Sequence, residues 1–324
     1  GNTGSTPVGV KYKDSKMDKT LCVIAVHSDD DLSIKSTCSN IKYFKEISDK
    51  IVIVNSKEFV DDDPLKKCID KEYGDKNIEF HYCANLISLN HGKWIFYIDN
   101  IYKHDYDHVI LTNDSFLIID TIIPFIELHL SDNYEMTGMV SSREGGWHCQ
   151  DFLRAYNSDS ITKAIEFYKE KNILNGLFLD VKDVDATRYQ EAHKALINSE
   201  IESCQVYSKQ ACLYTLPLTY KKNLNFDNET LKEYIEEKAY PIIKHRKLGF
   251  TEYKRKVIPK DFDPQEYKSV NPDLNFPTEE ELTQHFKQHG LHEGRLYKKD
   301  QEVNLPEFIA KAVEGELNYA KLND

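Results

Sequence analysis

Two uninterrupted apolar runs, LCVIAV at residues 21–26 and IVIV within residues 49–56, constrain the fold of this chain most. Between them lies SIKSTCSNIKYFKEIS, residues 33–48, in which apolar side chains recur at helical spacing. Strands with one solvated face alternate apolar and polar residues, whereas these runs are apolar throughout. The order strand, helix, strand, with fully buried strands, predicts a parallel sheet that helices cover on both faces.

The same pattern continues along the chain. Further strands are predicted at residues 78–83, 108–113 and 134–140, and further helices at residues 93–102, 118–130, 160–172 and 185–201. The predicted fold class is therefore α/β, a Rossmann-type domain with a mostly parallel sheet flanked by helices. A small helical appendage follows it, because prolines and Gly290 divide residues 261–297 into short helical segments.

The predicted domain organisation has three parts. Residues 1–16 are rich in Gly, Ser and Lys, lack periodicity and precede Met17, so they are predicted to be a remnant of cloning. Residues 17–257 form the α/β domain, which ends after a short extended stretch around Pro241. Residues 258–324 form the C-terminal module, whose final stretch is predicted to be a helix.

Charge and composition exclude several classes of protein. The net charge of −12 argues against nucleic-acid binding, which needs clustered Lys and Arg. No apolar run reaches the roughly eighteen residues of a membrane span, and no signal peptide is recognisable, so a cytoplasmic protein is expected. The seven cysteines are odd in number and contain no CxxC pair, which predicts reduced thiols.

Polar side chains follow three of the predicted strands. They are His27-Ser28-Asp29, Asn55-Ser56 and Asn113-Asp114-Ser115. In an open parallel sheet, ligands bind beyond the carboxyl ends of the strands, where helix N-termini also point. Asp114 supplies a carboxylate through which Mg²⁺ or Mn²⁺ can bridge a diphosphate, so these strand ends predict a nucleotide-diphosphate site. The alternative is that residues 113–115 only cap a helix beginning near Phe116.

A second segment, SLNHGKW at residues 88–94, lies between two predicted strands. It combines a flexible Gly92 with Lys93, whose ammonium group can meet a phosphate. Trp94 can lock the following helix onto the sheet. The segment therefore strengthens the expectation of a phosphate-binding site.

SLNHGKW followed by VILTNDS resembles the GxDFGKW and LLNDS motifs of the rhamnan-synthesis type glycosyltransferases of bacteria and large DNA viruses. VIAVHSDDDL is similar to this family's first strand and turn, GGWHCQDFLRAYN to its HxQSFF segment, and YPIIKH to its PFIK segment. The resemblance covers roughly residues 20 to 250. It implies a GT-A-like fold in which NDS replaces the DXD metal motif. The segment FDPQEYKSVNPDL…HFKQHGLHEGR resembles a short module of viral and bacterial glycan-processing proteins.

On the donor side, Asp114 is the candidate metal ligand, and His245 could complete the metal shell, because GT-A folds often recruit a late histidine. A surface histidine is the alternative for His245. The other candidate donor contacts, to the sugar, the ribose, the base or the phosphates, are His27, Asn55, Asn90, Lys93, Asn113, Ser115 and Lys244. The family usually has Asp at the position of Asn90, so the resemblance does not fix the sugar or ribose contact there.

On the acceptor side, Asp151 is the candidate catalytic base, with His148 beside it, because a Gly-Gly turn can place both residues at the mouth of a pocket. The family commonly has Ser at the position of Asp151, so the role of that segment is not carried over. The alternative is that Asp151 caps a helix formed by FLRAY.

The predicted function is a glycosyltransferase that moves a hexose or deoxyhexose from a UDP-, GDP- or dTDP-linked donor to a glycan acceptor, with Mn²⁺ or Mg²⁺. If the protein is viral, host cytoplasm is its expected location.

One alternative is a haloacid-dehalogenase-like phosphatase, because DDDLS at residues 29–33 has the DxDxS spacing and VILT offers Thr112. Against it, His27 and Ser28 separate the first strand from Asp29. The other alternative is an inactive glycan-binding protein.

Overall fold

A computed structural model describes residues 18–27, 30–57, 61–74, 77–216, 224 and 227–317. The predicted cloning remnant, residues 1–16, lies outside the described residues. The chain divides into two compact units, residues 1–223 and residues 224–324. The boundary predicted from the sequence, between residues 257 and 258, stays a prediction.

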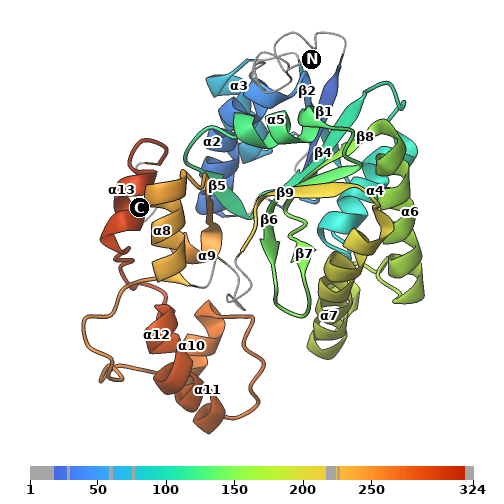
Figure 1. The fold of residues 1–324 in the computed structure, drawn as a ribbon. Helices are drawn as coiled ribbons and strands as arrows, with labels where there is room; N and C mark the ends of the chain where they lie inside the picture. Colours follow the sequence, from blue (N-terminus) through green and yellow to red (C-terminus); the bar gives the residue numbers. More distant parts are fainter. Residues whose placement is uncertain are drawn as a thin grey trace. The chain divides into compact units, whose positions relative to one another are not determined.

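The first half of the sheet is parallel, as the continuous apolar runs predict. The strands β1 (Thr20–Val26), β2 (Lys50–Asn55), β3 (Ile78–Tyr82) and β4 (His108–Asn113) lie in the order β3-β2-β1-β4. Figure 1 labels β2, β1 and β4 of this half. Every residue of β1 is buried, because helices cover both faces of the sheet.

The second half of the sheet reverses direction. The strands β8 (Leu153–Asn157), β6 (Met136–Ser142) and β7 (His148–Cys149) continue the sheet beyond β4 with antiparallel pairing, and β9 (Gln210–Tyr214) pairs in parallel with β6. Only β6 is predicted from the sequence. The FLRAY segment forms β8, so the helix offered as an alternative there is wrong. Five residues are too few for the periodicity of side chains to distinguish a strand from a helix.

Helices pack on both faces of the sheet. They are α2 (Asp31–Ile47), α3 (Pro64–Glu72), α4 (Asn90–Asn100), α5 (Ile123–Ser131), α6 (Ser158–Leu174) and α7 (Ala186–Ser203). α4 and α6 lie side by side (Figure 1). Their buried side chains share a core with alternate residues of β1 and β4, whereas α2 packs against β2. The helix predicted at residues 118–130 begins only at Ile123, because Ile118 ends β5 (Phe116–Ile118) and an irregular stretch, residues 119–122, follows it.

Two of the cysteines are not reduced thiols. Cys149 on β7 and Cys212 on β9 form a disulfide that crosses β6 at Gly138. A Cβ atom at Gly138 would lie 2.6 Å from Cβ of Cys149, so only glycine leaves room for this crossing. The prediction of reduced thiols is wrong for this pair, because strand neighbours, rather than sequence spacing, decide which cysteines meet.

The second unit contains short elements. They are α8 (Asn228–Lys238), β10 (Ile242–Lys244), α9 (His245–Leu248), α10 (Pro264–Val270), α11 (Glu279–His285), a π-helical turn (Phe286–Gly290), α12 (Leu291–Glu293) and α13 (Glu307–Val313). An aromatic core around Tyr267, Phe286 and Tyr297 holds α10, α11 and α12 together. The predicted short helices of this segment are confirmed. Among the described residues of the whole chain, no helix has the length and apolar character needed to span a membrane.

Candidate functional site

The carboxyl ends of β1 and β4 meet at one edge of the sheet. The two strands are parallel neighbours, and the backbone N–H of His27 donates to Oδ2 of Asp114 at 2.8 Å. Two of the three polar strand ends predicted from the sequence therefore belong to one site. Ser28 and Asp29, from the first of these ends, lie outside the described residues.

The lysine of the SLNHGKW segment lies within electrostatic range of Asp114. Lys93 is in the first turn of α4 and has an exposed fraction of only 3%. Burial lowers the pKa of Lys93 and raises the pKa of Asp114, and the attraction between the two charges opposes both shifts. The two motifs predicted to form a donor site thus bring a buried cation and a carboxylate to the same edge of the sheet.

A constrained backbone precedes Lys93. Leu89, the residue before α4, has a φ of 51°, which is rare for a residue with a bulky side chain. The carbonyl oxygen of Leu89 accepts a hydrogen bond from Nζ of Lys93 at 3.4 Å. A Cβ atom at Gly92 would lie 2.3 Å from Oγ of Ser88, so Gly92 serves close packing rather than flexibility. The start of α4 is therefore fixed by local packing.

Trp94 holds α4 on the sheet. Its indole is fully buried, and Nε1 donates to the carbonyl of Thr112 on β4 at 2.9 Å. The prediction that this tryptophan locks the helix onto the sheet is confirmed. Because Thr112 immediately precedes the Asn113-Asp114-Ser115 turn, the same hydrogen bond fixes the position of α4 along β4 relative to the candidate site.

Residues 113–115 form a turn between two strands. Oδ1 of Asn113 accepts from the backbone N–H of Ser115 at 3.0 Å and from its hydroxyl at 2.7 Å. The chain then enters β5 at Phe116, so the alternative that these residues cap a helix is wrong. The Asn113 side chain shapes the turn, which holds Asp114 at the edge of the sheet.

Asp151 reaches the same edge from the antiparallel strand beside β4. In the register of β4 with β8, Thr112 pairs with Leu153, and the Thr112 hydroxyl donates to the carbonyl of Phe152 at 2.7 Å. Asp151 lies two residues before Leu153, ahead of β8, just as Asp114 lies two residues after Thr112, beyond the end of β4. The two carboxylates predicted to act in the site are therefore at the same end of neighbouring strands.

His91 is the partner of Asp151. Its Nε2 lies 3.2 Å from Oδ2 of Asp151, and its ring stacks on Tyr168 of α6 with a centroid distance of 4.0 Å. The exposed fraction of His91 is 3%, and Nδ1 has no hydrogen-bond partner among the described residues. This histidine was missed from the sequence, although it stands two residues before Lys93 in the segment that was singled out.

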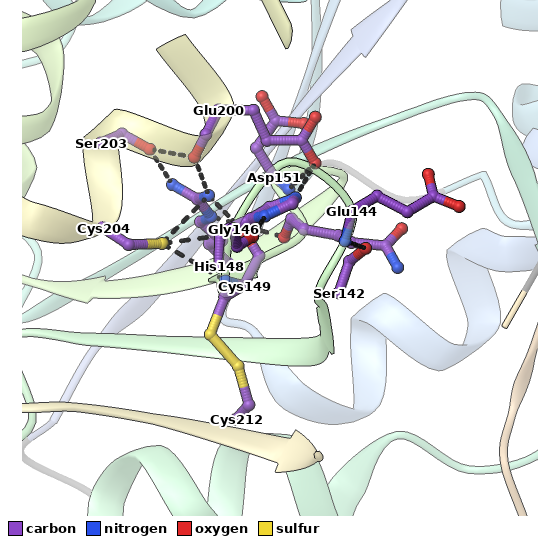
Figure 2. A network of polar contacts seen from close by, with 12 residues as sticks. Ser142, Glu144, Gly146, His148, Cys149, Asp151, Glu200, Ser203, Cys204 and Cys212 are labelled. Atoms are coloured by element: carbon purple, nitrogen blue, oxygen red, sulfur yellow. Dashed lines mark hydrogen bonds and ion pairs between the residues drawn. A yellow bond between two sulfur atoms is a disulfide. The ribbon is translucent and has the colours of Figure 1, made fainter. Parts of the chain in front are cut away.

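His148 and Glu200 complete the surroundings of Asp151 (Figure 2). Oε1 of Glu200, on α7, accepts from the backbone N–H of Asp151 at 3.1 Å and lies 3.8 Å from Nε2 of His148. Nδ1 of His148 is 2.8 Å from the carbonyl oxygen of Gly146, and burial lowers the pKa of this imidazole. His148 therefore ties the Gly-Gly turn to α7, and Glu200 was not predicted.

A buried guanidinium holds the segment that carries Asp151. Arg154 on β8 is fully buried and donates to the carbonyl oxygens of Cys149 and Glu200, the latter at 3.1 Å, and to Oγ of Ser203 at 2.7 Å. These bonds join β7 to the end of α7 (Figure 2). A planar group with several donors suits this task, because each donor meets a different acceptor.

The remaining predicted residues of the first unit have mixed surroundings. Nδ1 of His27 lies 2.7 Å from Oγ of Ser56, so the ends of β1 and β2 also touch. The Asn55 side chain is fully buried and bonds the backbone N–H of Lys57 at 2.9 Å and Asp63 at 3.4 Å. Those contacts favour a role for Asn55 in shaping the β2–α3 connection over contact with a nucleotide, which stays a prediction. Asn90 is half-buried at the first position of α4.

Lys244 and His245 belong to the second unit, where Lys244 ends β10 and His245 begins α9. Both side chains are half-buried. Their predicted roles beside Asp114, as a donor contact and as a metal ligand, stay predictions.

The chemistry of the site fits a divalent cation shared with a diphosphate. Among the described residues, no three His, Cys, Asp or Glu side chains gather as a set of metal ligands. Mg²⁺ is typically held by one or two carboxylates together with substrate phosphates rather than by an all-protein cage. Asp114, at the edge of the sheet and within electrostatic range of Lys93 in the first turn of α4, matches that arrangement.

The structure argues against one residue of the phosphatase alternative, Thr112. The hydroxyl of Thr112 is buried and donates to the carbonyl of Phe152, so it is committed within the sheet. Asp31 stands in the first turn of α2, where it pairs with Lys35 at 2.6 Å. The proposed nucleophile of that alternative, Asp29, lies outside the described residues.

Comparisons with known proteins find similarity only among solved structures. No protein-family model and no curated protein matches the sequence. A Desulfovibrio desulfuricans protein assigned as a nucleotide-diphospho-sugar transferase is 11% identical, with a TM-score of 0.37, over 68% of this chain and 92% of its own. The bifunctional glycosyltransferase WbbM is 10% identical, with a TM-score of 0.39, over 82% of this chain and 51% of its own.

A third similar structure is the galactosyltransferase LgtC in complex with donor and acceptor sugar analogues. It is 12% identical, with a TM-score of 0.36, over 60% of this chain and 72% of its own. Similarity at this level assigns no function to the chain.

Proposed function

We propose that this protein is a glycosyltransferase that moves a sugar from a nucleotide-diphosphate donor to an acceptor hydroxyl. One observation carries the proposal: two carboxylates lie at the same end of neighbouring strands but have different partners. Asp114 is within electrostatic range of the buried Lys93, and Asp151 contacts the buried His91. Sugar transfer needs two such sites, one for the departing diphosphate and one for the attacking hydroxyl.

On the donor side, Lys93 and the N-terminus of α4 supply positive charge for the diphosphate. Asp114 would hold a divalent cation against the diphosphate oxygens, and that cation would neutralise the negative charge that develops on the leaving group. The buried position of Lys93 strengthens its attraction to a phosphate, because little water screens the charge. Donor binding would also bring compensating negative charge to an ammonium whose pKa burial lowers.

On the acceptor side, Asp151 accepts the proton of the attacking hydroxyl. His91 is the positioning residue, because its Nε2 holds Oδ2 of Asp151 and its ring is fixed by stacking on Tyr168. Glu200 fixes the backbone of Asp151 through its N–H. A carboxylate held from two sides keeps one orientation toward the acceptor, which reduces the entropy lost when the acceptor reacts.

The finer parts of the proposal come from the sequence resemblance. They are a UDP, GDP or dTDP donor, transfer of a hexose or deoxyhexose, manganese as the cation, a growing glycan as the acceptor and a cytoplasmic location. His27, Asn113 and Ser115 lie at the same edge of the sheet as Asp114, where the proposal places the donor.

A thermal-shift panel tests the proposal. The purified protein is unfolded with UDP, GDP, dTDP and their sugar conjugates, each with and without Mn²⁺. A ligand at a hundredfold excess over its Kd stabilises the folded state by about 2.7 kcal/mol, so one nucleotide class should raise the unfolding temperature of the wild type. Asp114→Ala should lose the part of the shift that depends on Mn²⁺. No shift from any nucleotide would overturn the proposal.

A further inference from the structure

Two cysteines of the first unit meet outside the candidate glycosyl-transfer site. The sulfur of Cys38 on α2 lies 2.8 Å from the sulfur of Cys68 on α3, and the two residues are thirty positions apart. Both are free thiols in the structure. The sulfurs of a disulfide are about 2.05 Å apart, so bond formation requires only a small approach of these two atoms.

The surroundings allow a reagent to reach one thiol and keep the other in place. Cys68 is half-buried, whereas Cys38 is buried. The backbone of Cys38 is held by Tyr73, the residue after α3, whose hydroxyl donates to the carbonyl of Cys38 at 2.7 Å. The outer thiol is therefore the one that meets an oxidant, and the inner thiol is fixed behind it.

We propose that Cys38 and Cys68 form an oxidisable dithiol site that exchanges with small disulfides such as oxidised glutathione. The Cys68 thiolate attacks one sulfur of the small disulfide and releases its first half as a thiolate. The Cys38 thiol then gives its proton to solvent and attacks the Cys68 sulfur, which releases the second half as a thiolate. Two protein thiols are oxidised, and one small disulfide is reduced to two thiols.

The charge environment supports this order of attack. The hydrogen bond with Cys38 lowers the pKa of the Cys68 thiol to about 7, and Lys71 and Lys35 act in the same direction, while burial and Glu72 oppose them. The same hydrogen bond raises the pKa of Cys38, followed in effect by burial. The thiolate form therefore resides on Cys68, the half-buried member of the pair.

The crosslink would join the two helices that follow β1 and β2. α2 and α3 pack together, and their N-caps are Asp30 and Asp63. Asp63 accepts a hydrogen bond from the hydroxyl of Tyr82 at 2.9 Å. A disulfide between the helices restricts the unfolded chain, so it should raise the unfolding temperature.

Non-reducing peptide mapping tests the site. The whole protein is equilibrated with reduced and oxidised glutathione at several ratios, alkylated and digested with trypsin. The expected product is STCSNIK, residues 36–42, linked to CIDK, residues 68–71. The half-buried Cys83 provides the matched control, since Cys83→Ser should still form this product. Cys38→Ser should instead carry glutathione on Cys68.

Two results of the peptide mapping would overturn the proposal. One is recovery of both peptides singly alkylated at every glutathione ratio, and the other is linkage of either cysteine to a different one. Unfolding gives a second readout that does not depend on digestion. Oxidation should raise the unfolding temperature of the wild type and of Cys83→Ser more than that of Cys68→Ser. Cys68→Ser is still expected to shift somewhat, because the Cys149–Cys212 disulfide also responds to the glutathione ratio. Equal shifts in all three would also overturn it.

Discussion

His91 Nε2 lies 3.2 Å from Oδ2 of Asp151, although sixty residues separate the two along the chain. His91 is in the first turn of α4, and Asp151 immediately precedes the segment that leads into β8. Their meeting depends on the packing of α4 against α6, where Tyr168 stacks on His91, and on the antiparallel pairing of β8 with β4. Tertiary structure therefore makes a carboxylate and imidazole pair that no local sequence pattern contains.

Replacing the carboxylate should slow the chemical step. Asp151→Asn removes the proton acceptor while keeping the shape of the side chain, so we expect kcat to fall by about 10²- to 10⁴-fold. Steady-state release of nucleoside diphosphate from the donor identified by the thermal-shift panel measures this. Asp105→Asn is the matched control, since Asp105 is exposed before the start of β4, at the opposite end of that strand. An unchanged kcat in Asp151→Asn would contradict the assignment.

Replacing the histidine should act through the carboxylate. His91→Phe keeps a ring for Tyr168 to stack on but removes the contact with Oδ2 of Asp151, so we expect a fall in kcat of about tenfold, with donor binding unchanged. Because two residues that act as a unit are not additive, His91→Phe should have little further effect in an Asp151→Asn background. The double-mutant cycle in kcat measures the coupling. Full additivity would show that His91 does not act through Asp151.

The stability of the fold should decrease as the pH falls below about 6.5. Burial, followed by the neighbouring His108, lowers the pKa of His129 to about 3. The unfolded state therefore binds more protons than the folded state between pH 6.5 and pH 3. The stability that the folded state has with neutral His129 is fully present above pH 6.5 and is lost as the pH falls toward 3. The slope approaches about 1.4 kcal/mol per pH unit.

Urea unfolding at several pH values measures this slope. His129→Gln should flatten it between pH 6.5 and pH 4.5, above the range in which most carboxylates titrate. His193→Gln, at an exposed position on α7, should leave it unchanged. Equal slopes in the wild type and His129→Gln would contradict the assignment.

A methyl group at position 138 should destabilise the fold. The Cβ of Gly138→Ala would lie 2.6 Å from Cβ of Cys149 and 3.2 Å from Sγ of Cys212, where the disulfide crosses β6. Overpacking of this kind costs about 1–3 kcal/mol. Chemical denaturation measures the loss, and Gly315→Ala is the control, because among the described residues no atom beyond its chain neighbours lies within 4 Å of the added Cβ. Equal losses of stability in Gly138→Ala and Gly315→Ala would contradict this interpretation.

Local patterns predict the parallel half of the fold well. The apolar runs of β1, β2 and β4 are buried. A strand needs apolar side chains at successive positions when helices cover both faces of its sheet, so these runs predict a parallel, covered sheet. The position of Asp114 at a strand end is likewise predicted, because the chemistry of an α/β sheet is concentrated at its carboxyl edge. Trp94 also behaves as the sequence indicates.

The antiparallel half could not be predicted in this way. β7 and β8 are short, and their identity as strands depends on pairing with β6 and β4, which are distant in sequence. Glu200 contacts the backbone of Asp151 from α7, and Cys149 meets Cys212 across β6. These contacts depend on which strands become neighbours, and a single sequence does not state that order.

Nucleotide binding and turnover, measured together on two variants, test the division of labour between Asp114 and Asp151 most directly. With the donor class identified, calorimetry gives the Kd of the nucleotide in the presence of Mn²⁺, and release of nucleoside diphosphate gives kcat. Asp151→Asn should bind the nucleotide like the wild type and lose turnover, whereas Asp114→Ala should lose both. Wild-type nucleotide affinity in Asp114→Ala, or wild-type turnover in Asp151→Asn, would contradict the account.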